Sequence, residues 1–372
     1  MEAIDTLPKT IRIHFTNVMG AGAIQLLESL LPALVASKKV KIAKVYLPEG
    51  GVLSKFSAFS SSTTVLKYKR YLPNAISRFL ECTFLSRKFN EPSPLLVLGD
   101  LPLRISSPQI LFVQNSHLIK LSRINWHPGA LKFAIARFIF RFNIKRVSAF
   151  VVQTDTMRDE LATSYPSISN RIHVIRHPVP QWVLTNNVKW QNLDRELKRN
   201  LRLFYPAAGY PHKNHNLLSK IDASNSEDWS IERFTLTIDQ ASNPAPQISW
   251  VDCVGFLSPA EMINTYKGAD ALVFLSKKES LGFPLLEAMH LGMPIVCPDL
   301  PYARALCGDH AIYFDPNSVE SLRLALIKLK RLFAENWSPD WSGQLSEIPK
   351  TWESFSSKLL NVVTKASSSH LN

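Results

Sequence analysis

Short apolar runs alternate with helical segments along most of the chain, and this alternation limits the possible folds more than any other feature. Runs such as Leu95–Leu98, Ile110–Val113 and Ala271–Phe274 are almost continuously apolar, which is typical of parallel strands that are buried on both faces. Repeated strand–helix units predict parallel sheets with helices on both sides, an α/β fold. We expect strands at residues 11–15, 40–47, 95–98, 110–113, 149–152, 171–175, 201–205, 234–238, 249–254, 271–274, 294–297 and 311–314. We expect helices at residues 23–36, 73–89, 128–147, 214–221, 259–267, 284–291 and 319–333, another helix capped by Thr154, and a loop at 50–64.

The length of 372 residues suggests two domains. An extended His177–Pro180 segment divides the chain into Rossmann-like domains at residues 1–180 and 181–345, with a polar connection over 181–200. Residues 346–372 are expected to form a C-terminal helix and tail, and a return to the first domain is one option. Open α/β sheets bind ligands beyond the carboxyl ends of their strands, so we expect two such edges to face each other across a cleft.

The excess of positive charge lies entirely in the first half of the chain. Residues 1–180 contain 24 Lys and Arg against 10 Asp and Glu, a net charge of +14, whereas residues 181–372 have a net charge of −1. No acidic residue lies between Asp100 and Asp155. Such a field attracts nucleic acid, phospholipid headgroups or a phosphorylated substrate, and a basic surface that only favours solubility is the alternative. The neutral second half argues against a nucleic-acid channel, which would need both walls.

A helix expected at 128–147 combines aromatic residues with spaced positive charges. It suits an anionic membrane surface, or it packs on its own sheet with its arginines extending into solvent. We name Arg137, Arg141, Lys145 and Arg146 as candidates for contact with a membrane or an anionic acceptor.

Other features exclude several classes of protein and site. The four cysteines form no paired motif and no zinc-type cluster, so we expect reduced, mostly buried thiols. No uninterrupted apolar run has the length of a membrane span, and the first residues lack the pattern of a secretory signal. We therefore expect a cytoplasmic protein that at most lies against a membrane.

The segment from Phe274 to Val296 contains most of the candidate ligand-binding residues. A strand ends near Phe274, a loop follows, and Pro284 opens a helix. The N–H groups of Ser280, Leu281, Gly282 and Phe283, with the helix dipole, predict a phosphate site. Glu279 precedes that site and Glu287 lies about one turn into the helix, so both carboxylates could accept hydroxyl groups of a nucleotide sugar. The alternative for each is a carboxylate that only complements the helix dipole.

This segment resembles the E-x7-E signature of the retaining group 1 glycosyltransferases, glycosyltransferase family 4, which have the GT-B fold. Lys213-Asn214, Gly255-Phe256-Leu257 and the run from Pro298 to Pro316 resemble the same family. The resemblance is strong over residues 200–335 and looser over 1–180. It implies two Rossmann-like domains with parallel sheets facing across a cleft. Residues 1–180 would form the strongly basic acceptor-side domain, and residues 181–345 the nucleotide-sugar-binding domain.

The resemblance also implies a role for each matching residue. Glu287 would bind the donor ribose, Glu279 a hydroxyl of the transferred sugar, and Lys213 the leaving diphosphate, aided by the amides of Leu281 to Phe283. Gly20, Ala21 and Gly22 match the glycine-rich loop that approaches the diphosphate, His117 matches a histidine that contacts the donor sugar, and Gly255 and Phe256 complete the donor site. The family usually has an Arg about five residues before the Lys, and this chain does not. Arg104, Lys277 or Lys278 could compensate, while His212 and His215 flank Lys213 and are expected to be structural.

The implied reaction is retaining transfer of a sugar from a nucleotide-diphosphate donor to a glycan acceptor. Relatives of this type often extend lipid-diphosphate-linked glycans at the cytoplasmic face of bacterial membranes, so we expect a peripheral hexosyltransferase of O-antigen or capsule assembly. The chain has no Asp-x-Asp motif, so we expect no metal or cofactor requirement and no nucleic-acid partner. A catalytically inactive binding protein of the same fold and a nucleotide-sugar epimerase remain alternatives.

Overall fold

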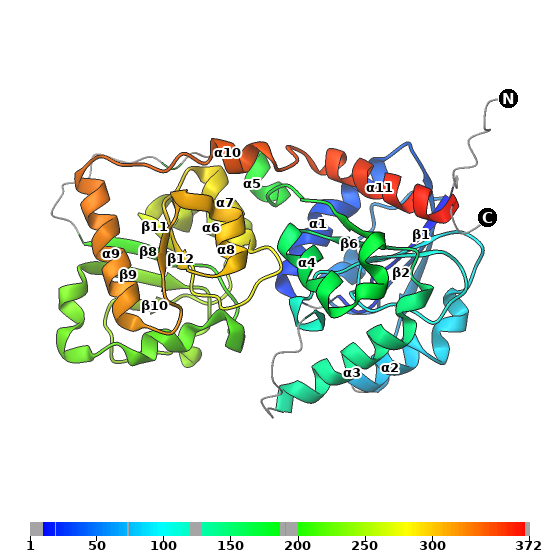
Figure 1. Ribbon diagram of the computed structural model, residues 1–372, viewed down its shortest axis with the longest axis horizontal. Coiled ribbons are helices and arrows are strands. Elements are labelled where there is room, and N and C mark those ends of the chain that lie inside the picture. Colours follow the sequence, from blue (N-terminus) through cyan, green and yellow to red (C-terminus); the bar gives the residue numbers. More distant parts are fainter. Residues whose placement is uncertain are drawn as a thin grey trace. The chain divides into compact units, whose positions relative to one another are not determined.

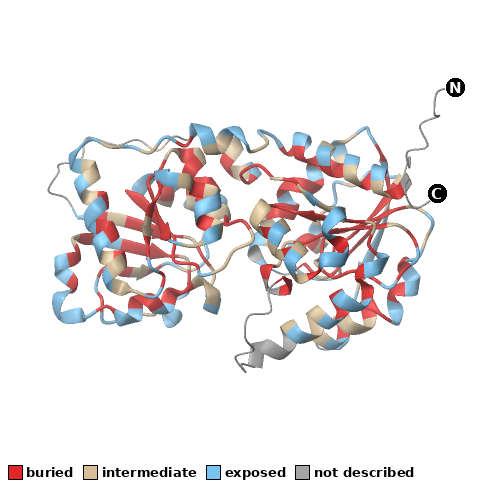
Figure 2. Cartoon of the chain, in the orientation of Figure 1, coloured by how far each residue is buried: buried red, intermediate tan, exposed pale blue. Residues whose placement is uncertain are grey.

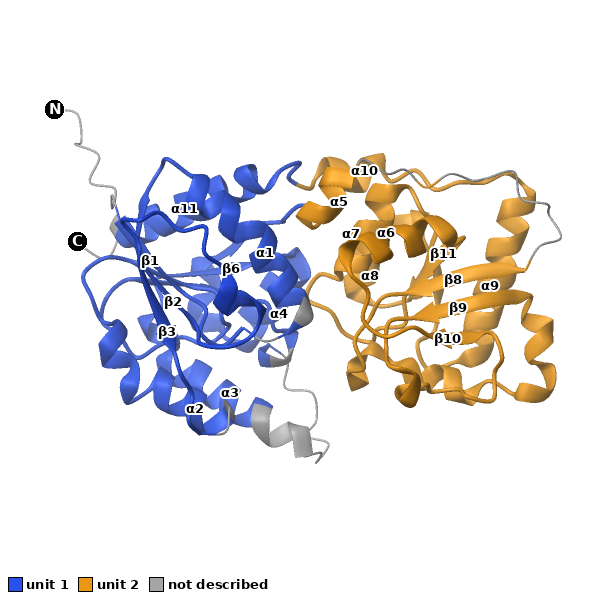
Figure 3. Cartoon of the chain, turned by 180° about the vertical axis from the view of Figure 1, so that it is seen from behind, with its two compact units in different colours: residues 1–178, 349–372 blue, residues 179–348 orange. Residues whose placement is uncertain are grey.

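A computed structural model describes residues 10–18, 20–72, 74–119, 128–186, 190 and 200–368. The chain forms two compact units (Figure 3), one of residues 1–178 with 349–372 and one of residues 179–348. The last segment of the chain thus belongs to the first unit, which was one of the options for residues 346–372, and the unit boundaries lie within four residues of the expected 180 and 345. Among the helices in the described ranges, none has both the length and the apolar character needed to cross a bilayer.

Unit 1 is a parallel seven-stranded sheet with helices on both faces. Its strand order is β3-β2-β1-β4-β5-β6-β7. Helices α1 and α11 pack together, and α11 contacts β5 and β6, while α2 and α3 cover the other face (Figure 1). The strands are β1 (Thr10–His14), β2 (Lys41–Pro48), β3 (Thr64–Tyr68), β4 (Leu95–Val97), β5 (Gln109–Phe112), β6 (Ala149–Val152) and β7 (Ile172–Val174). The helices are α1 (Ala21–Ala36), α2 (Asn74–Cys82), α3 (Pro128–Asn143), α4 (Asp155–Ser164) and α11 (Trp352–Ser368).

Unit 2 repeats this architecture with a parallel six-stranded sheet in the order β10-β9-β8-β11-β12-β13. Helices α6, α7 and α8 lie on one face, and α9 packs on β12 and β13 from the other (Figure 1). The strands are β8 (Leu201–Tyr205), β9 (Ile231–Leu236), β10 (Val251–Cys253), β11 (Ala271–Val273), β12 (Ile295–Pro298) and β13 (Ile312–Phe314). The helices are α5 (Gln181–Asn186), α6 (Pro259–Gly268), α7 (Phe283–Leu291), α8 (Pro301–Cys307), α9 (Val319–Ala334) and α10 (Ser342–Ser346).

The first strand of each unit lies in the middle of its sheet and determines where a ligand can bind. Strand β1 lies between β2 and β4, and β8 lies between β9 and β11. The chain therefore builds the sheet first to one side and then to the other, which creates a topological switch point at the carboxyl ends of β1 and β4 and of β8 and β11. Loops that leave neighbouring strands diverge there and leave room for a ligand.

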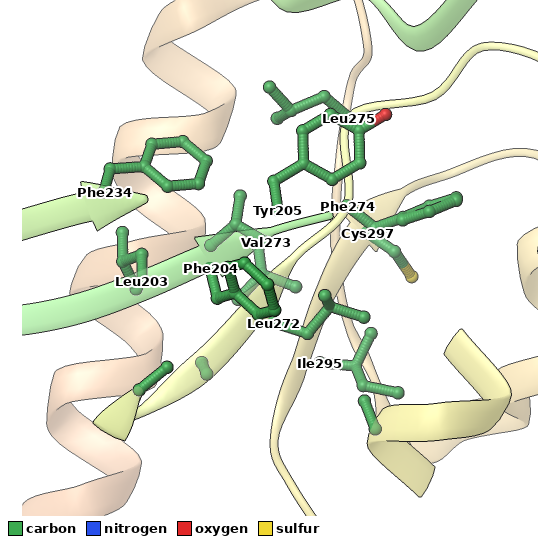
Figure 4. Packing of buried hydrophobic residues seen from close by; sticks show 14 of the residues in the cluster. Leu203, Phe204, Tyr205, Phe234, Leu272, Val273, Phe274, Leu275, Ile295 and Cys297 are labelled. Atoms are coloured by element: carbon green, nitrogen blue, oxygen red, sulfur yellow. The ribbon is translucent and has the colours of Figure 1, made fainter. Parts of the chain in front are cut away.

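The central strands of both sheets are buried on both faces, which explains the continuous apolar runs of the sequence (Figure 2). In unit 2, Phe204 packs edge-on against Tyr266 with ring centroids 4.9 Å apart, and Tyr205 packs edge-on against Phe274 at 5.4 Å. Figure 4 shows Phe204, Tyr205 and Phe274 within this core. The expected α/β class and parallel sheets are therefore confirmed, and all four cysteines are buried thiols, as expected.

Several expected elements differ in the structure. The helix expected at 73–89 ends at Cys82 and is followed by a 3-10 turn at Leu85–Phe89. Residues expected to form a helix at 214–221 form a 3-10 turn instead, because Asn214 before it adopts a left-handed conformation with φ of 60°. Strand β3 was not expected, since it is an exposed edge strand. Helices α5, α8 and α10 were also missed, and the expected connection at 181–200 begins with α5, whereas 187–189 and 191–199 lie outside the described residues.

Candidate functional site

Lys213 and Glu279 form an ion pair at the switch point of unit 2. Lys213 follows β8 and Glu279 follows β11, so the two residues come from adjacent strands although they are 66 positions apart. Lys213 Nζ lies 2.6 Å from Glu279 Oε1, and the side chains are only 16% and 11% exposed. The structure therefore brings together two residues that the sequence analysis selected separately.

Hydrogen bonds between the two loops fix this pair. The Tyr205 hydroxyl at the end of β8 donates to the carbonyl oxygen of Lys213 at 2.9 Å. The amide of Lys277 and the hydroxyl of Ser276 donate to the carbonyl oxygen of His212, at 2.8 and 3.2 Å. Lys213 Nζ also lies 5.9 Å from the centre of the Phe274 ring. Both loops therefore have defined positions relative to the sheet.

Helix α7 begins at Phe283, four residues after Glu279, and its first turn contains the backbone of the expected phosphate site. Gly282 is its N-cap and has a φ of 89°, and a Cβ at this position would lie 3.2 Å from Leu285 Cδ1. Only glycine fits this left-handed turn without strain. No side chain caps the helix, and the positive end of its dipole lies next to Ser280 and Leu281.

Glu287 is built into the packing between α6 and α7. Its side chain is 2% exposed, and Oε2 accepts a hydrogen bond of 2.7 Å from the hydroxyl of Tyr266 on α6. Burial, together with the Glu287 charge, raises the pKa of Tyr266 well above its ordinary value. The second glutamate of the E-x7-E pair thus has a fixed position, and any ligand contact would share its carboxylate with Tyr266.

Two histidines flank Lys213, and both are neutral near pH 7. Burial and then the charge of Lys213 lower the pKa of His215 to about 4. The same causes, with a contribution from Lys278, lower the pKa of His212 to about 4. Lys277 is exposed and donates a hydrogen bond of 2.8 Å to Asn317 Oδ1. Lys213 is therefore charged at neutral pH, whereas His212 and His215 on either side of it are not.

The other expected donor-site residues lie elsewhere on the two units. Gly255, with φ of 75°, and Phe256, which is 89% exposed, follow β10 at the edge of the second sheet. In unit 1, Gly20 is the N-cap of α1 with open space around it, and Gly22 is exposed in its first turn. The side chains of Ala21 and His117 lie outside the described residues. Arg104 lies 5.6 Å from the centre of the Phe142 ring on α3.

A buried ionic cluster in unit 1 was not foreseen from the sequence. Glu81 on α2 is fully buried and lies 3.0 Å from His14, 2.8 Å from Arg70 and 3.3 Å from Arg78, and the Thr16 hydroxyl donates to it. Burial by itself would raise the pKa of Glu81. The hydrogen bond with His14 and the charges of the two arginines nevertheless hold it well below its usual value. The Arg78–Glu81 spacing on one helix was the only local signal of this cluster.

Apolar and basic side chains share the outer surface of α2 and α3, which we call the α2–α3 face. Its exposed apolar residues are Ile76 on α2 and Phe138 and Phe142 on α3. A groove of about 300 Å³ between the helices is lined by apolar residues such as Phe79 and Ile135. The four predicted basic residues, Arg137, Arg141, Lys145 and Arg146, form what we call the α3 basic cluster, in which all but the half-buried Arg137 are exposed.

Among the described residues, no group of three or more His, Cys, Asp or Glu side chains is arranged to hold a metal ion. The positive charge that the structure offers at the unit 2 site comes instead from Lys213 and the N-terminus of α7. This arrangement is suited to binding an anion that also carries hydroxyl groups, because a carboxylate lies next to each source of positive charge.

Part of the chain is similar in sequence to a known family and to known proteins. Residues 248–335 match the family described as Glycosyl transferases group 1. A 206-residue region, 53% of the chain, is 26% identical to the O-antigen chain mannosyltransferase RfbU of Salmonella typhimurium. A region of 88 residues, 24% of the chain, is 30% identical to the O-antigen chain mannosyltransferase B of Escherichia coli. The matched regions span 55% and 23% of the lengths of these relatives.

A solved structure shares the fold over almost the entire chain. The crystal structure of WaaG, a glycosyltransferase involved in lipopolysaccharide biosynthesis, aligns with a TM-score of 0.63 and 12% identity, covering 95% of this chain and 99% of WaaG. The matched segment 248–335 contains α6, α7 and both glutamates of the E-x7-E pair. Residues 248–335 therefore match the group 1 glycosyltransferases, and the chain shares its fold with WaaG, in agreement with the GT-B fold that the resemblance implied.

Proposed function

We propose that this protein is a retaining glycosyltransferase that moves a sugar from a nucleotide-diphosphate donor to a glycan acceptor in bacterial polysaccharide assembly. The observation that supports this most strongly is the Lys213–Glu279 ion pair at the switch point, in which Glu279 belongs to the loop that leads into α7. The names of the similar O-antigen mannosyltransferases favour a mannosyl donor.

In this proposal, the hard step is the departure of the nucleoside diphosphate. Lys213 and the α7 amides around Gly282 stabilise the charge that develops on the diphosphate in a site with little solvent. The ammonium group of Lys213 has three N–H donors, so it can keep its bond to Glu279 and still bind a phosphate oxygen. Glu279 accepts a hydroxyl of the transferred sugar.

Two further groups bind the rest of the donor. Glu287 accepts the ribose hydroxyls through a carboxylate that Tyr266 holds in place. The exposed ring of Phe256, with Gly255 beside it, offers an apolar surface for the base. Gly20 to Gly22 and His117 keep their proposed roles at the diphosphate and the donor sugar.

We further propose that no metal ion is required, because Lys213 and the α7 N-terminus supply the positive charge that a metal would otherwise provide. The leaving diphosphate then accepts the proton of the acceptor hydroxyl, so the reaction needs no separate protein base. Retention of configuration follows if the acceptor attacks from the side of the leaving group.

The acceptor in this proposal is linked to a membrane lipid through a diphosphate. The α2–α3 face supports this, because it combines exposed Phe138 and Phe142 with the α3 basic cluster. Aromatic side chains enter the interface of a bilayer, while lysine and arginine attract anionic headgroups. The protein would then work as a peripheral enzyme at the cytoplasmic face of the inner membrane.

The test is a transfer and hydrolysis assay with a panel of mannose, glucose, galactose and N-acetylglucosamine nucleotides, in the presence of lipid extracts that contain glycan acceptors. We expect turnover with one donor, product of unchanged anomeric configuration, and loss of turnover in Lys213→Met. Binding of nucleotides without any turnover would favour the inactive binding protein. Interconversion of the sugar without transfer would favour an epimerase.

A further inference from the structure

The carboxylate of Asp239 lies beside Gly255 at the carboxyl edge of the second sheet. Asp239 comes after β9, and Gly255 comes after β10, the neighbouring strand. A Cβ at Gly255 would lie 3.5 Å from Asp239 Oδ1, and the φ of 75° at Gly255 disfavours any residue that has a side chain. Glycine at this position therefore leaves the space next to the Asp239 carboxylate open.

Backbone hydrogen bonds fix the two loops that carry these residues. The amide of Gly255 donates to the carbonyl oxygen of Ile238 at 3.0 Å, which joins the loop after β10 to the loop after β9. The amide of Ser242 donates to the carbonyl oxygen of Asp239 at 2.8 Å, which closes a 3-10 turn over Gln240–Ser242. The Asp239 side chain therefore extends from a backbone that has a defined position relative to Gly255.

The fold does not use this carboxylate. Asp239 is the N-cap residue of the 3-10 turn, a position where aspartate normally accepts a backbone hydrogen bond, but here its side chain accepts none. Among the residues that the structure describes, no other group donates a hydrogen bond to this carboxylate or forms an ion pair with it. The side chain is exposed, so both of its oxygens are available to a ligand.

Asp239 and Phe256 lie at the distance from the proposed diphosphate site that the base of a nucleotide would reach. The diphosphate site is at the ends of β8 and β11, whereas Asp239 and Phe256 follow β9 and β10. These two positions are separated by two strand spacings, about 10 Å. A nucleoside spans a comparable distance between its phosphate and its base. The ring of Phe256 is 89% exposed and offers a face on which a base can stack.

We propose that Asp239 selects guanine as the base of the donor nucleotide, with its two oxygens accepting hydrogen bonds from N1–H and from the 2-amino group. This inference rests on the proposed function for its donor site. Guanine presents two adjacent N–H donors on one edge, which match the two oxygens of a carboxylate. Uracil and thymine present one N–H between two carbonyl oxygens, which a carboxylate repels. Adenine and cytosine present an amino group beside an unprotonated ring nitrogen, which a carboxylate also repels.

The experiment measures binding of GDP, IDP, UDP, CDP and ADP to the full chain by isothermal titration calorimetry. IDP differs from GDP only in lacking the 2-amino group, so the ratio of the two affinities reports on a single hydrogen bond. Asp239→Asn keeps the shape of the side chain but replaces one acceptor by a donor. Asp228→Asn is the matched control, because Asp228 is also exposed but precedes β9 and lies at the amino end of the same strand. Phe256→Ala reports separately on stacking of the base.

We expect the wild-type protein to bind GDP roughly tenfold or more tightly than IDP, UDP, CDP or ADP. Asp239→Asn should remove most of the preference for GDP over IDP, and Asp228→Asn should leave that preference unchanged. Phe256→Ala should weaken GDP and IDP by the same factor, because stacking does not depend on the 2-amino group. The proposal is overturned if no nucleotide binds, if another base is preferred, or if Asp239→Asn keeps the wild-type ratio of GDP to IDP affinity.

Failure of this proposal is distinguishable from failure of the proposed function. Binding of UDP or ADP as tightly as GDP contradicts the selection of guanine but leaves the donor site in place. Selective binding of GDP that depends on Asp239, together with no sugar transfer in the donor assay, supports the selection of guanine and contradicts the transferase activity.

Discussion

Replacing Lys213 by methionine separates the stabilising and the functional roles of its charge. The substitution keeps the aliphatic stem beside Phe274 and removes the ammonium, which leaves the Glu279 carboxylate unpaired although it is only 11% exposed. Breaking a fully buried pair costs about 3–5 kcal/mol, and the slight exposure here reduces the expected cost to about 2–4 kcal/mol. For a domain of this size, that loss lowers Tm by roughly 5–12 °C.

The double variant Lys213→Met/Glu279→Gln should recover most of this stability, because it leaves no unpaired charge. It should not recover activity, and we expect turnover to fall at least about 100-fold in both variants, as for the loss of a group that stabilises developing charge. Urea unfolding followed by the fluorescence of Trp229 and Trp250, which are buried in unit 2, measures the first effect.

Two results would refute this reasoning. If Lys213→Met unfolds at the same urea concentration as the wild type, the ion pair does not exist in solution or is hydrated. If the double variant turns over donor as fast as the wild type, Lys213 does not stabilise the leaving diphosphate. The conservative variant Lys213→Arg should keep stability closer to the wild type, since it retains the charge.

Further predictions concern the membrane, the second glutamate, metal ions and pH. Changing the α3 basic cluster to glutamine should release the protein from anionic vesicles in co-sedimentation, because each charge contributes about 1 kcal/mol to the free energy of membrane binding. Nucleotide affinity should not change. Wild-type binding that does not depend on the anionic-lipid content would contradict this. Glu287→Ala should weaken nucleotide binding in calorimetry and destabilise the fold by about 1–3 kcal/mol, because it orphans the buried Tyr266 hydroxyl, whereas Tyr266→Phe should keep most nucleotide affinity. Activity should survive excess EDTA, and a loss that magnesium or manganese restores would overturn the proposed charge stabilisation. His177 is buried against Trp352 of α11, and burial lowers its pKa to about 4, compared with about 6.5 in the unfolded chain. The unfolded chain therefore binds a proton more readily, and the free energy of unfolding should fall by about 3 kcal/mol as the pH falls from 6.5 to 4. His177→Phe should remove this pH dependence, measured as Tm in thermal unfolding.

The strands buried on both faces were predictable, and the exposed edge was not. Strands β6 and β8 occupy the expected residues because every position except Arg202 is buried and is therefore apolar or aromatic. Strand β3 is exposed at four of its five positions, so its composition does not differ from that of a loop. The break after Cys82 and the 3-10 turn after Asn214 depend on tertiary contacts, such as the 2.9 Å bond from Asn214 Nδ2 to the carbonyl oxygen of Pro316. No periodicity within a short window reports such contacts.

The same distinction applies to the residues of the candidate site. Glu279, Gly282 and Glu287 are close in sequence, so a local sequence motif identified them as candidate site residues. Lys213 is distant from this motif in sequence and was identified only through the family resemblance. That Lys213 meets Glu279 follows from β8 lying beside β11, which is a property of the strand order and not of either segment. A contact that depends on distant partners, like the Lys213–Glu279 ion pair, becomes visible only when the sheet is assembled.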